Sequence, residues 1–320
     1  LETITAHAIN NTKNEADIES LVVVGVLAKG FNKAILKSNT VTSVTTNGGK
    51  ANNLSAKSIA NHESKGKVSA SGGALIGSGS AAIENYSKSK TGVATAGEWE
   101  IGNKFEALAL DKLGVGLKAE GVKGGLVGKN GISVKNIIEG DTSSFVDNHA
   151  KITGTGTVDV EAINEINTDI QGKSAGHGGV GLGDIYIGSN INKSTKALIK
   201  ENAVVETEGK QTYQAFTKGK INILGKVDAA GAAGGAKSKV VSNIEVDNLV
   251  KKYQGSVIGT KNSDQDITIA SSSDLDIDLK SVSDAKGAGA KSYSELKSDF
   301  RRNNNLEMTG KLSTQGKLNL

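Results

Sequence analysis

The chain has 320 residues with no cysteine, no proline and 41 glycines, and only 3% of its residues are aromatic. Its 38 Lys and Arg and 34 Asp and Glu are interspersed, for a formal net charge of +4. These values exclude disulfides and cysteine-based metal or thiol chemistry, show no basic footprint for nucleic acid, and favour a thin core of Ile, Val, Leu and Ala.

The first predicted element covers residues 1–20, where apolar and polar side chains alternate, as at Ile4, Ala6 and Ala8. The longest apolar run, Leu21–Ala28, is far shorter than the ~18–20 residues that span a bilayer, so we expect no membrane-spanning segment. Strict alternation returns further along the chain, at 157–160, 266–269 and 274–279. In a strand this pattern puts the aliphatic side chains on one face and the polar ones on the other. The sequence therefore predicts an all-β protein.

Two segments leave a helical alternative open. Residues 292–302 carry Tyr293, Leu296 and Phe300 at helical spacing, and 103–113 is also ambiguous. In the sequence repeat, however, Tyr293 aligns with a strand position. We therefore favour a strand at 292–302, with a short helical insertion as the alternative.

An internal repeat of about 53 residues organises the chain. An asparagine recurs in steps of 53, 51, 54 and 53 residues, at Asn32, Asn85, Asn136, Asn190 and Asn243. The repeat units run over 21–71, 72–121, 122–176, 177–231 and 232–287, with a partial unit at 288–320. Because neither end carries a polar cap, we expect residues 1–320 to be one continuous solenoid segment, an internal fragment of a larger protein.

A second repeated motif predicts the inward side of each unit. Ala150–Ile152 returns as Ala203–Val205 and Ser256–Ile258, so Ile152, Val205 and Ile258 should occupy equivalent inward positions. Glycine and asparagine turn signals every 5 to 12 residues divide each unit into short strands. Such a unit predicts about three rungs of a parallel β-helix, ~4.8 Å apart. The absence of proline supports this fold, because every central strand must donate its backbone N–H groups. Antiparallel β-sandwich domains are the alternative.

The repeated glycines and asparagines are interpreted as structural. Glycine pairs such as Gly124–Gly125 and Gly178–Gly179 lack the Lys-Ser/Thr of a phosphate-binding loop, so we expect tight turns where no Cβ fits. The recurring asparagines are interpreted as turn residues. Three rungs per unit would place successive copies roughly 14 Å apart, too far to form one ladder.

The sequence predicts no catalytic residue, cofactor or metal. The four histidines have no partner at metal-ligand spacing and are expected in solvated loops, at His7, His62, His149 and His177. Acidic groups that should face outward from strands occur at Glu98/Glu100, Asp159/Glu161 and Asp274/Asp276/Asp278. Carbohydrate-cleaving β-helices use such carboxylates, but other repeats here have Lys, Gln or Thr at these positions. We therefore interpret them as an ordinary solvated face.

The least uniform stretch is 247–302, where basic doublets occur beside aromatic residues. The candidate surface-contact residues are Lys251, Lys252, Tyr253, Phe300, Arg301 and Arg302. Two separate doublets do not form a nucleic-acid channel, so we expect no nucleic-acid partner. They would suit a sulfated glycan.

The segment GGVGLGDIYIGSNIN from Gly178, followed by STKALIKENAVVETEGKQTYQAFTKGKINI, resembles a known repeat family. It is similar to the passenger repeats of large type V-secreted filamentous haemagglutinin-like adhesins and leukotoxin-family filamentous adhesins of Gram-negative bacteria. The residues that match are Val134–Ile137, Ser189–Ile191, Ser242–Ile244, Thr195–Ala197 and Val158–Ala162. The resemblance covers about 21–287 and is weaker in 72–121.

This resemblance implies a right-handed parallel β-helix in a parent protein that passes an outer-membrane secretion pore. The parent would be secreted or displayed on the bacterial surface, where a host cell surface protein or glycan would be its partner. We therefore expect a monomeric, structural and host-contacting segment of an adhesin or leukotoxin-type virulence protein. One alternative is a passive spacer that presents a binding domain elsewhere in the parent. Another is a carbohydrate-active enzyme, with three or more carboxylates clustered on adjacent rungs.

Overall fold

The computed structural model describes residues 2–22, 27–261 and 264–320, so residues 23–26 of the apolar run lie outside it. In the described residues the regular structure is entirely β, and every strand pair is parallel. The strands are β1 (Thr3–Val22), β2 (Leu27–Gly73), β3 (Ile76–Val146), β4 (Lys151–Gly154), β5 (Thr157–Ile199), β6 (Val204–Thr207), β7 (Gln211–Ala230), β8 (Ala233–Lys252), β9 (Val257–Thr260), β10 (Ile267–Lys286), β11 (Lys291–Met308), β12 (Lys311–Ser313) and β13 (Leu318–Asn319).

The predicted all-β parallel solenoid is confirmed, and the antiparallel sandwich is not observed. The segments 103–113 and 292–302 lie within β3 and β11, so both are strands rather than helices. Among the residues that the structure describes, no helix is long and apolar enough to span a membrane.

One sequence repeat forms one rung, a full circuit of the solenoid. Paired residues on adjacent rungs are 50 residues apart at Thr3 and Asn53, and 53 apart at Asn190 and Asn243. The expectation of three rungs per repeat is therefore wrong. Several of the supposed turn glycines lie inside long strands, as Gly219 does in β7, so each strand is much longer than the turn signals suggested.

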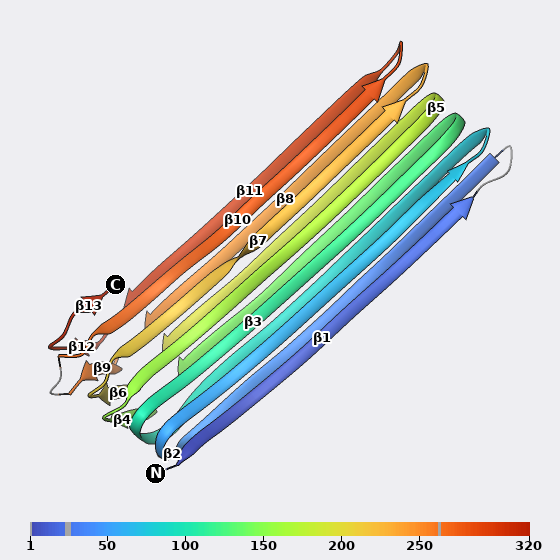
Figure 1. Ribbon diagram of the computed structural model, residues 1–320. Helices are drawn as coiled ribbons and strands as arrows, with labels where there is room; N and C mark the ends of the chain where they lie inside the picture. The colour runs from blue at the N-terminus through green and yellow to red at the C-terminus, as the bar shows by residue number, and fades with distance from the viewer. Residues whose placement is uncertain (1, 23–26, 262–263) are drawn as a thin grey trace.

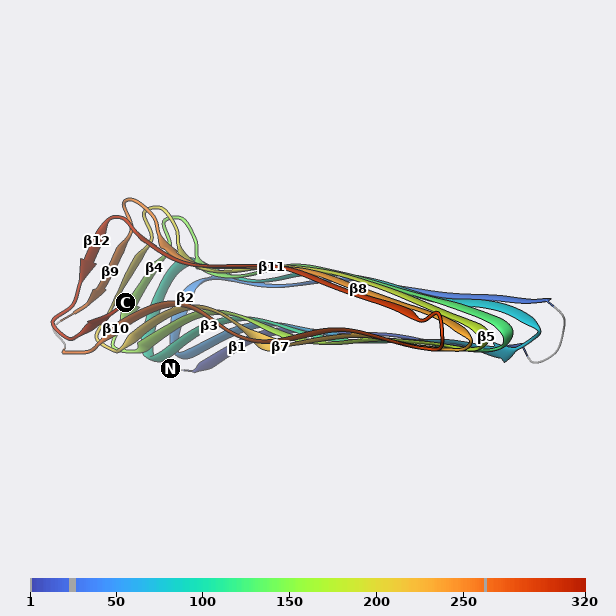
Figure 2. The same ribbon diagram turned by 90° about the horizontal axis from the view of Figure 1, so that it is seen from above.

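The solenoid is a flat slab with two long faces (Figures 1 and 2). The front sheet contains β1, β7 and β10 with parts of β2, β3 and β5, and the back sheet contains β8 and β11 with the remaining parts of β2, β3 and β5. The two sheets meet at a narrow edge, where the chain turns directly from front to back. At the opposite, wide end, β4, β6, β9 and β12 form a short third face (Figure 2). Both termini lie at this wide end (Figure 1).

The interior consists of two apolar clusters, one towards each end of the slab. The cluster towards the narrow edge contains Leu36, Leu117 and Ile223, and the cluster at the wide end contains Phe105 and Val205. Alternation along the strands produces both, because every second side chain points inward. The predicted inward column is confirmed at the wide end, where buried Ile152, Val205 and Ile258 are paired in register.

A seam of polar side chains separates the two apolar clusters. The sequence analysis did not predict this seam. Between the sheets Asn164 accepts a hydrogen bond from Thr142 Oγ1 at 2.8 Å and donates one to Thr195 Oγ1 at 2.6 Å. Thr217 Oγ1 continues the chain of contacts, at 2.9 Å from Thr195 Oγ1 and 2.7 Å from Asn248 Oδ1. These hydrogen bonds link polar side chains of successive rungs, so the seam continues across the stack.

Left-handed residues occur at both ends of the slab in the described residues. At the wide end they form one column: Gly48, Gly97, His149, Asn202, Gly255 and Gly310. Glycine, asparagine and histidine are among the residues that tolerate this conformation most readily. At the narrow edge Gly178 has φ +148°, and a Cβ there would lie 1.7 Å from the carbonyl oxygen of Gly125. The expected close packing, with no room for a Cβ, is confirmed at Gly125 and Gly178, whereas Gly124 has open space for one.

The recurring asparagines are strand residues, contrary to their interpretation as turn residues. Asn85 and Asn136 face inward on adjacent rungs, and Asn85 Nδ2 donates to Asn136 Oδ1 at 2.9 Å. Asn190 and Asn243 face outward, in another column, with 3.5 Å between amide nitrogen and oxygen. Because one repeat is one rung, these copies do stack in pairs. The expected separation of roughly 14 Å was wrong for that reason.

Candidate functional site

The predicted basic patch contains one residue that is not on the surface. Lys252 is only 1% exposed, and its ammonium donates hydrogen bonds of 2.7 Å to the carbonyl oxygens of Ser256 and Thr309. Burial lowers the pKa of this lysine. Neighbouring residues of a strand point to opposite faces, so Lys251 and Lys252 could not both face solvent. Lys252 is therefore a core residue at the wide end, and its assignment as a surface contact is corrected.

The other five predicted residues are spread over the last two rungs. Lys251 pairs with Glu307 at 2.7 Å, and its ammonium lies 4.7 Å from the centre of the Tyr253 ring. Arg301 pairs with Asp299 at 3.1 Å. Arg301 lies six residues before Glu307 on β11, so roughly 20 Å of strand separates it from the Lys251–Glu307 pair.

Phe300 and Arg302 continue inward-facing columns of the rungs below them. They pair with Ile244 and Val246 and are exposed on the last rung. The six predicted residues therefore do not form one patch.

A cluster of three carboxylates lies on the outside of the front sheet. Glu106 and Asp159 are paired in register on adjacent rungs, and Glu161 follows at the next outward position. Burial raises the pKa of Glu161, and the charges of Asp159 and Glu106 raise it further. For Glu106, burial also acts to raise the pKa, but hydrogen bonds from Lys57 and Ser55 outweigh it and leave the value below its ordinary range.

Two lysines neutralise part of this cluster. Lys57 Nζ lies 3.0 Å from Glu106 Oε2, and Lys104 Nζ lies 3.3 Å from Asp159 Oδ2. A protonated carboxylic acid beside an ionised one is the arrangement that glycoside hydrolases use. Here Glu106 and Asp159 are paired with lysines on the outer surface of a sheet. In the described chain, no group of three or more His, Cys, Asp or Glu could hold a metal ion.

A shallow depression on the front sheet carries polar groups. Its floor is formed where Gly114 and Gly116 face outward on β3 and leave space between side chains of the neighbouring rungs. Three adjoining hollows of about 400, 380 and 290 Å³ meet there. Their polar lining includes Lys65, Lys67, Lys118, Asp169, Gln171, Asn61, Lys112, Glu165 and Asn167.

The sequence analysis did not identify this depression, although a signal was present. Two glycines at positions i and i+2 of an alternating segment must lie on one face of a strand. A Cβ at Gly114 or Gly116 would make only ordinary contacts, and neither glycine has the positive φ that requires glycine. These glycines are therefore not needed by the fold itself. They leave room on the surface.

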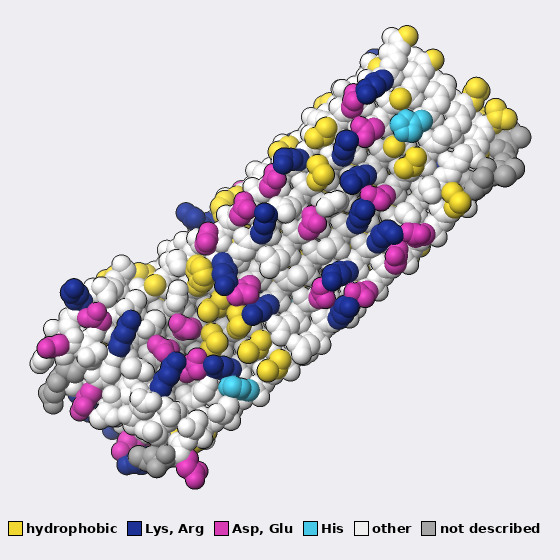
Figure 3. Space-filling view, in the orientation of Figure 1, with side chains coloured by type: hydrophobic (Ala, Val, Ile, Leu, Met, Phe, Trp, Pro, Cys, Tyr) yellow, Lys and Arg dark blue, Asp and Glu magenta, His cyan; other side chains and the backbone are white. Residues whose placement is uncertain are grey.

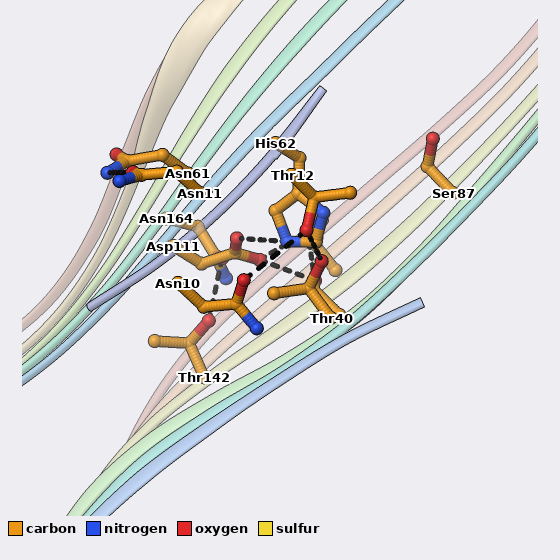
Figure 4. Close-up of polar contacts among 12 residues, drawn as sticks. Asn10, Asn11, Thr12, Thr40, Asn61, His62, Ser87, Asp111, Thr142 and Asn164 are labelled. Atoms are coloured by element: carbon orange, nitrogen blue, oxygen red, sulfur yellow. Dashed lines mark hydrogen bonds and ion pairs between the residues drawn. The ribbon is translucent and has the colours of Figure 1, made fainter. Parts of the chain in front are cut away.

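The N-terminal half of the seam contains a buried ionic cluster (Figure 4). Lys193 Nζ lies 2.6 Å from Asp111 Oδ2 and donates to Ser89 Oγ at 2.9 Å, while His62 Nε2 lies 3.3 Å from Asp111 Oδ1. Burial acts to raise the pKa of Asp111, but Lys193, His62 and Ser89 together hold it below its ordinary value. All four side chains lie between the sheets. The expectation of a solvated His62 is wrong, and the cluster is out of reach of an outside ligand.

Comparisons with family models, with curated proteins and with solved structures gave no match to this chain.

Proposed function

We propose that this chain is a structural and host-contacting segment of a secreted or surface-displayed filamentous adhesin or leukotoxin-type protein. The observation that carries the proposal is the packed interior: inward side chains from the two sheets form two apolar clusters, with a seam of polar side chains between them that includes the hydrogen bonds of Asn164. Any partner must therefore contact the outside of the sheets. Stacked rungs offer a long, repetitive surface there, suited to many weak contacts whose combined strength grows with length and copy number.

The depression over Gly114 and Gly116 is the contact site that we propose on this surface. Its lining of amides, carboxylates and lysines can donate and accept hydrogen bonds in several directions. Such a lining suits a hydroxyl-rich or charged ligand, such as a host cell surface glycan or a polar protein loop. Lys251, which is partly exposed, and the exposed Arg301 and Arg302 are basic residues at separate positions, and we keep them as a second set of candidate contacts rather than one patch.

The carboxylate cluster supports the enzymatic alternative only in part. Burial and the neighbouring Asp159 and Glu106 raise the pKa of Glu161, the direction that a general acid needs. None of the three hollows of the depression includes these residues in its lining. We therefore propose no catalytic activity. Cleavage of a polysaccharide by the purified chain, lost in a Glu161→Gln variant, would replace this proposal with the enzymatic one.

Binding of the purified chain to host cells tests the proposal. Gly116→Leu places a side chain in the depression without backbone strain, so we expect binding to fall about fivefold or more if the depression is the contact. Gly92→Leu is the matched control, because Gly92 is also an unstrained strand glycine, in the part of β3 that lies in the back sheet. A triple change of Lys251, Arg301 and Arg302 to Glu tests the second candidate with Lys252 kept intact.

The outcomes separate the proposals. Equal binding by the Gly116→Leu and Gly92→Leu variants would remove the depression from consideration. Undiminished binding by the triple variant would remove the basic residues. No binding by the unchanged chain would favour a passive spacer that presents a binding domain elsewhere in the parent.

A further inference from the structure

The narrow edge of the slab exposes large aliphatic side chains on several successive rungs. Leu75 is 54% exposed and Leu126 is 62% exposed, and their loops stack, since the Val127 N–H donates to the Leu75 carbonyl oxygen at 3.0 Å. Further exposed aliphatic side chains next to these loops are Leu21, Ile76, Val122 and Leu182. Hydrophobic side chains gather at this end of the molecule (upper right in Figure 3). The result is an apolar ridge that runs along the edge.

The ridge itself carries no charge. The edge segments at 73–77, 124–128 and 178–183, where the chain passes between the two sheets, contain no Asp, Glu, Lys, Arg or His. Gly125 and Gly178 in these segments lie so close to the rungs beside them that a Cβ could not fit. The edge is therefore a thin, convex, tightly stacked series of turns. A convex ridge cannot enclose a ligand, but it can insert between the molecules of a fluid layer such as a lipid bilayer.

Lysines that lack ion-pair partners flank the ridge on the back sheet. The two outward columns next to the edge contain four exposed lysines, Lys29, Lys129, Lys237 and Lys291, and one acidic residue, Asp184. Within the described parts of the chain, none of these lysines lies within ion-pair distance of a carboxylate, whereas lysines such as Lys57 and Lys104 on the front sheet do. The same columns expose two aromatic rings, Phe31 and Tyr293.

We propose that the narrow edge docks onto an anionic lipid bilayer. The aliphatic ridge would enter the boundary between headgroups and acyl chains, and the unpaired lysines would lie at the level of the anionic headgroups. Exposed aromatic rings beside such a ridge suit the same interfacial layer. An uncharged, convex ridge with a basic flank matches this surface better than a concave protein site. The inference goes beyond the proposed function, because it needs neither a host protein nor a glycan.

Flotation with pure lipid vesicles tests this inference. The chain should bind vesicles that contain about a third phosphatidylserine roughly tenfold more strongly than vesicles of phosphatidylcholine alone, and added salt should weaken the binding. Because these vesicles contain no protein or glycan, failure here would leave the proposed host contact untouched. The absence of vesicle binding would overturn the lipid inference.

Matched variants locate the contact. Leu75→Asp with Leu126→Asp should reduce binding about tenfold or more, because charged groups are costly in the apolar layer. Ile35→Asp with Val41→Asp is the control, since these residues are 51% and 59% exposed on β2, away from the ridge, and the change in charge is the same. Equal losses in the two variants would contradict docking by the edge.

A fluorescent reporter adds a direct readout of insertion. The single tryptophan, Trp99, is buried in the apolar cluster of the wide end, so a second tryptophan introduced as Leu75→Trp reports on the ridge. Its emission should shift to shorter wavelength with anionic vesicles. Self-association without lipid that disappears in the Leu75→Asp, Leu126→Asp variant would instead assign the edge to a second copy of the chain and overturn the proposal.

Discussion

Val205 shows how the direction of one side chain controls stability. It is buried between Ile152 and Ile258 of the adjacent rungs, whereas Glu206 faces outward with its carboxylate 3.8 Å from Lys261 Nζ. Val205→Asp would bury an unpaired carboxylate, and we expect it to lower the free energy of unfolding by about 3–5 kcal/mol. Glu206→Lys should change it by no more than about 0.5 kcal/mol. Denaturant unfolding measures both, and equal effects would contradict the inward–outward register.

Asp111 makes the stability of the chain depend on pH. Its pKa is lower in the folded protein than the ordinary value of about 3.9, so its contribution is present above about pH 4 and is lost as the pH falls through the folded value. His62, Lys193 and Ser89 are the groups that face it. We expect the unchanged protein to lose more stability between pH 6 and pH 3 than a variant with both Asp111→Asn and Lys193→Met.

The single variant Lys193→Met provides the control for this cluster. It would leave the Asp111 carboxylate buried without its cation, and we expect a loss of about 3–5 kcal/mol at pH 7. The double variant should lose less than the single one. Urea unfolding at each pH provides these values, and a double variant that loses as much as the single one would show that the pair is not coupled.

At the scale of the elements, the sequence predicted strand character well and strand length poorly. Alternation of apolar and polar residues is a local signal, and it correctly identified 274–279 and even the ambiguous 292–302 as strand. Strand ends depend on where the chain can turn without a clash between rungs. Gly219 is paired inside β7, and Gly178 is paired inside β5 where the chain passes from the front to the back sheet, so a glycine by itself does not mark a strand end.

The narrow-edge glycines should be far less tolerant than the glycines of the depression. Gly178→Ala would combine a positive φ with a contact of 1.7 Å to the Gly125 carbonyl oxygen, so we expect a loss of about 1–3 kcal/mol or more. Gly114→Ala makes only ordinary contacts and should be neutral or slightly stabilising, by up to about 1 kcal/mol. Thermal unfolding of the two variants compares them, and a harmless Gly178→Ala would argue against close stacking at this edge.

The sequence could predict only those features of the candidate site that depend on which face of a strand a residue occupies. The doublet at Lys251 and Lys252 looked like a surface patch, yet adjacent strand residues must face opposite ways, and Lys252 became a core residue. The carboxylates Glu106, Asp159 and Glu161 are brought together by pairing between rungs, which requires the register. The apolar ridge likewise depends on knowing that 73–77 and 124–128 are stacked turns.

At the scale of the whole molecule, the repeat length did not reveal how many rungs one repeat makes. A period of 53 residues fits three short rungs or one long rung equally well, because both return equivalent residues to equivalent positions. The recurring asparagines also did not give the strand register, because Asn136 pairs with Ser189 rather than with Asn190. A flat slab with strands of about 20 residues, roughly 66 Å long, follows only from the longer circuit.

Disulfide formation between introduced cysteines tests the single-rung repeat most directly. The chain has no cysteine of its own, and Lys118 and Gln171 are outward residues paired in register between β3 and β5. Adjacent rungs place their Cα atoms within the ~4.4–6.8 Å that a disulfide needs, whereas three rungs per repeat would separate them by roughly 14 Å. Lys118→Cys with Gln171→Cys should therefore oxidise readily to an intramolecular disulfide. Lys118→Cys with Asn167→Cys, shifted four residues along the same strand, should not. Failure of the first pair, or equal oxidation of both pairs, would contradict the account.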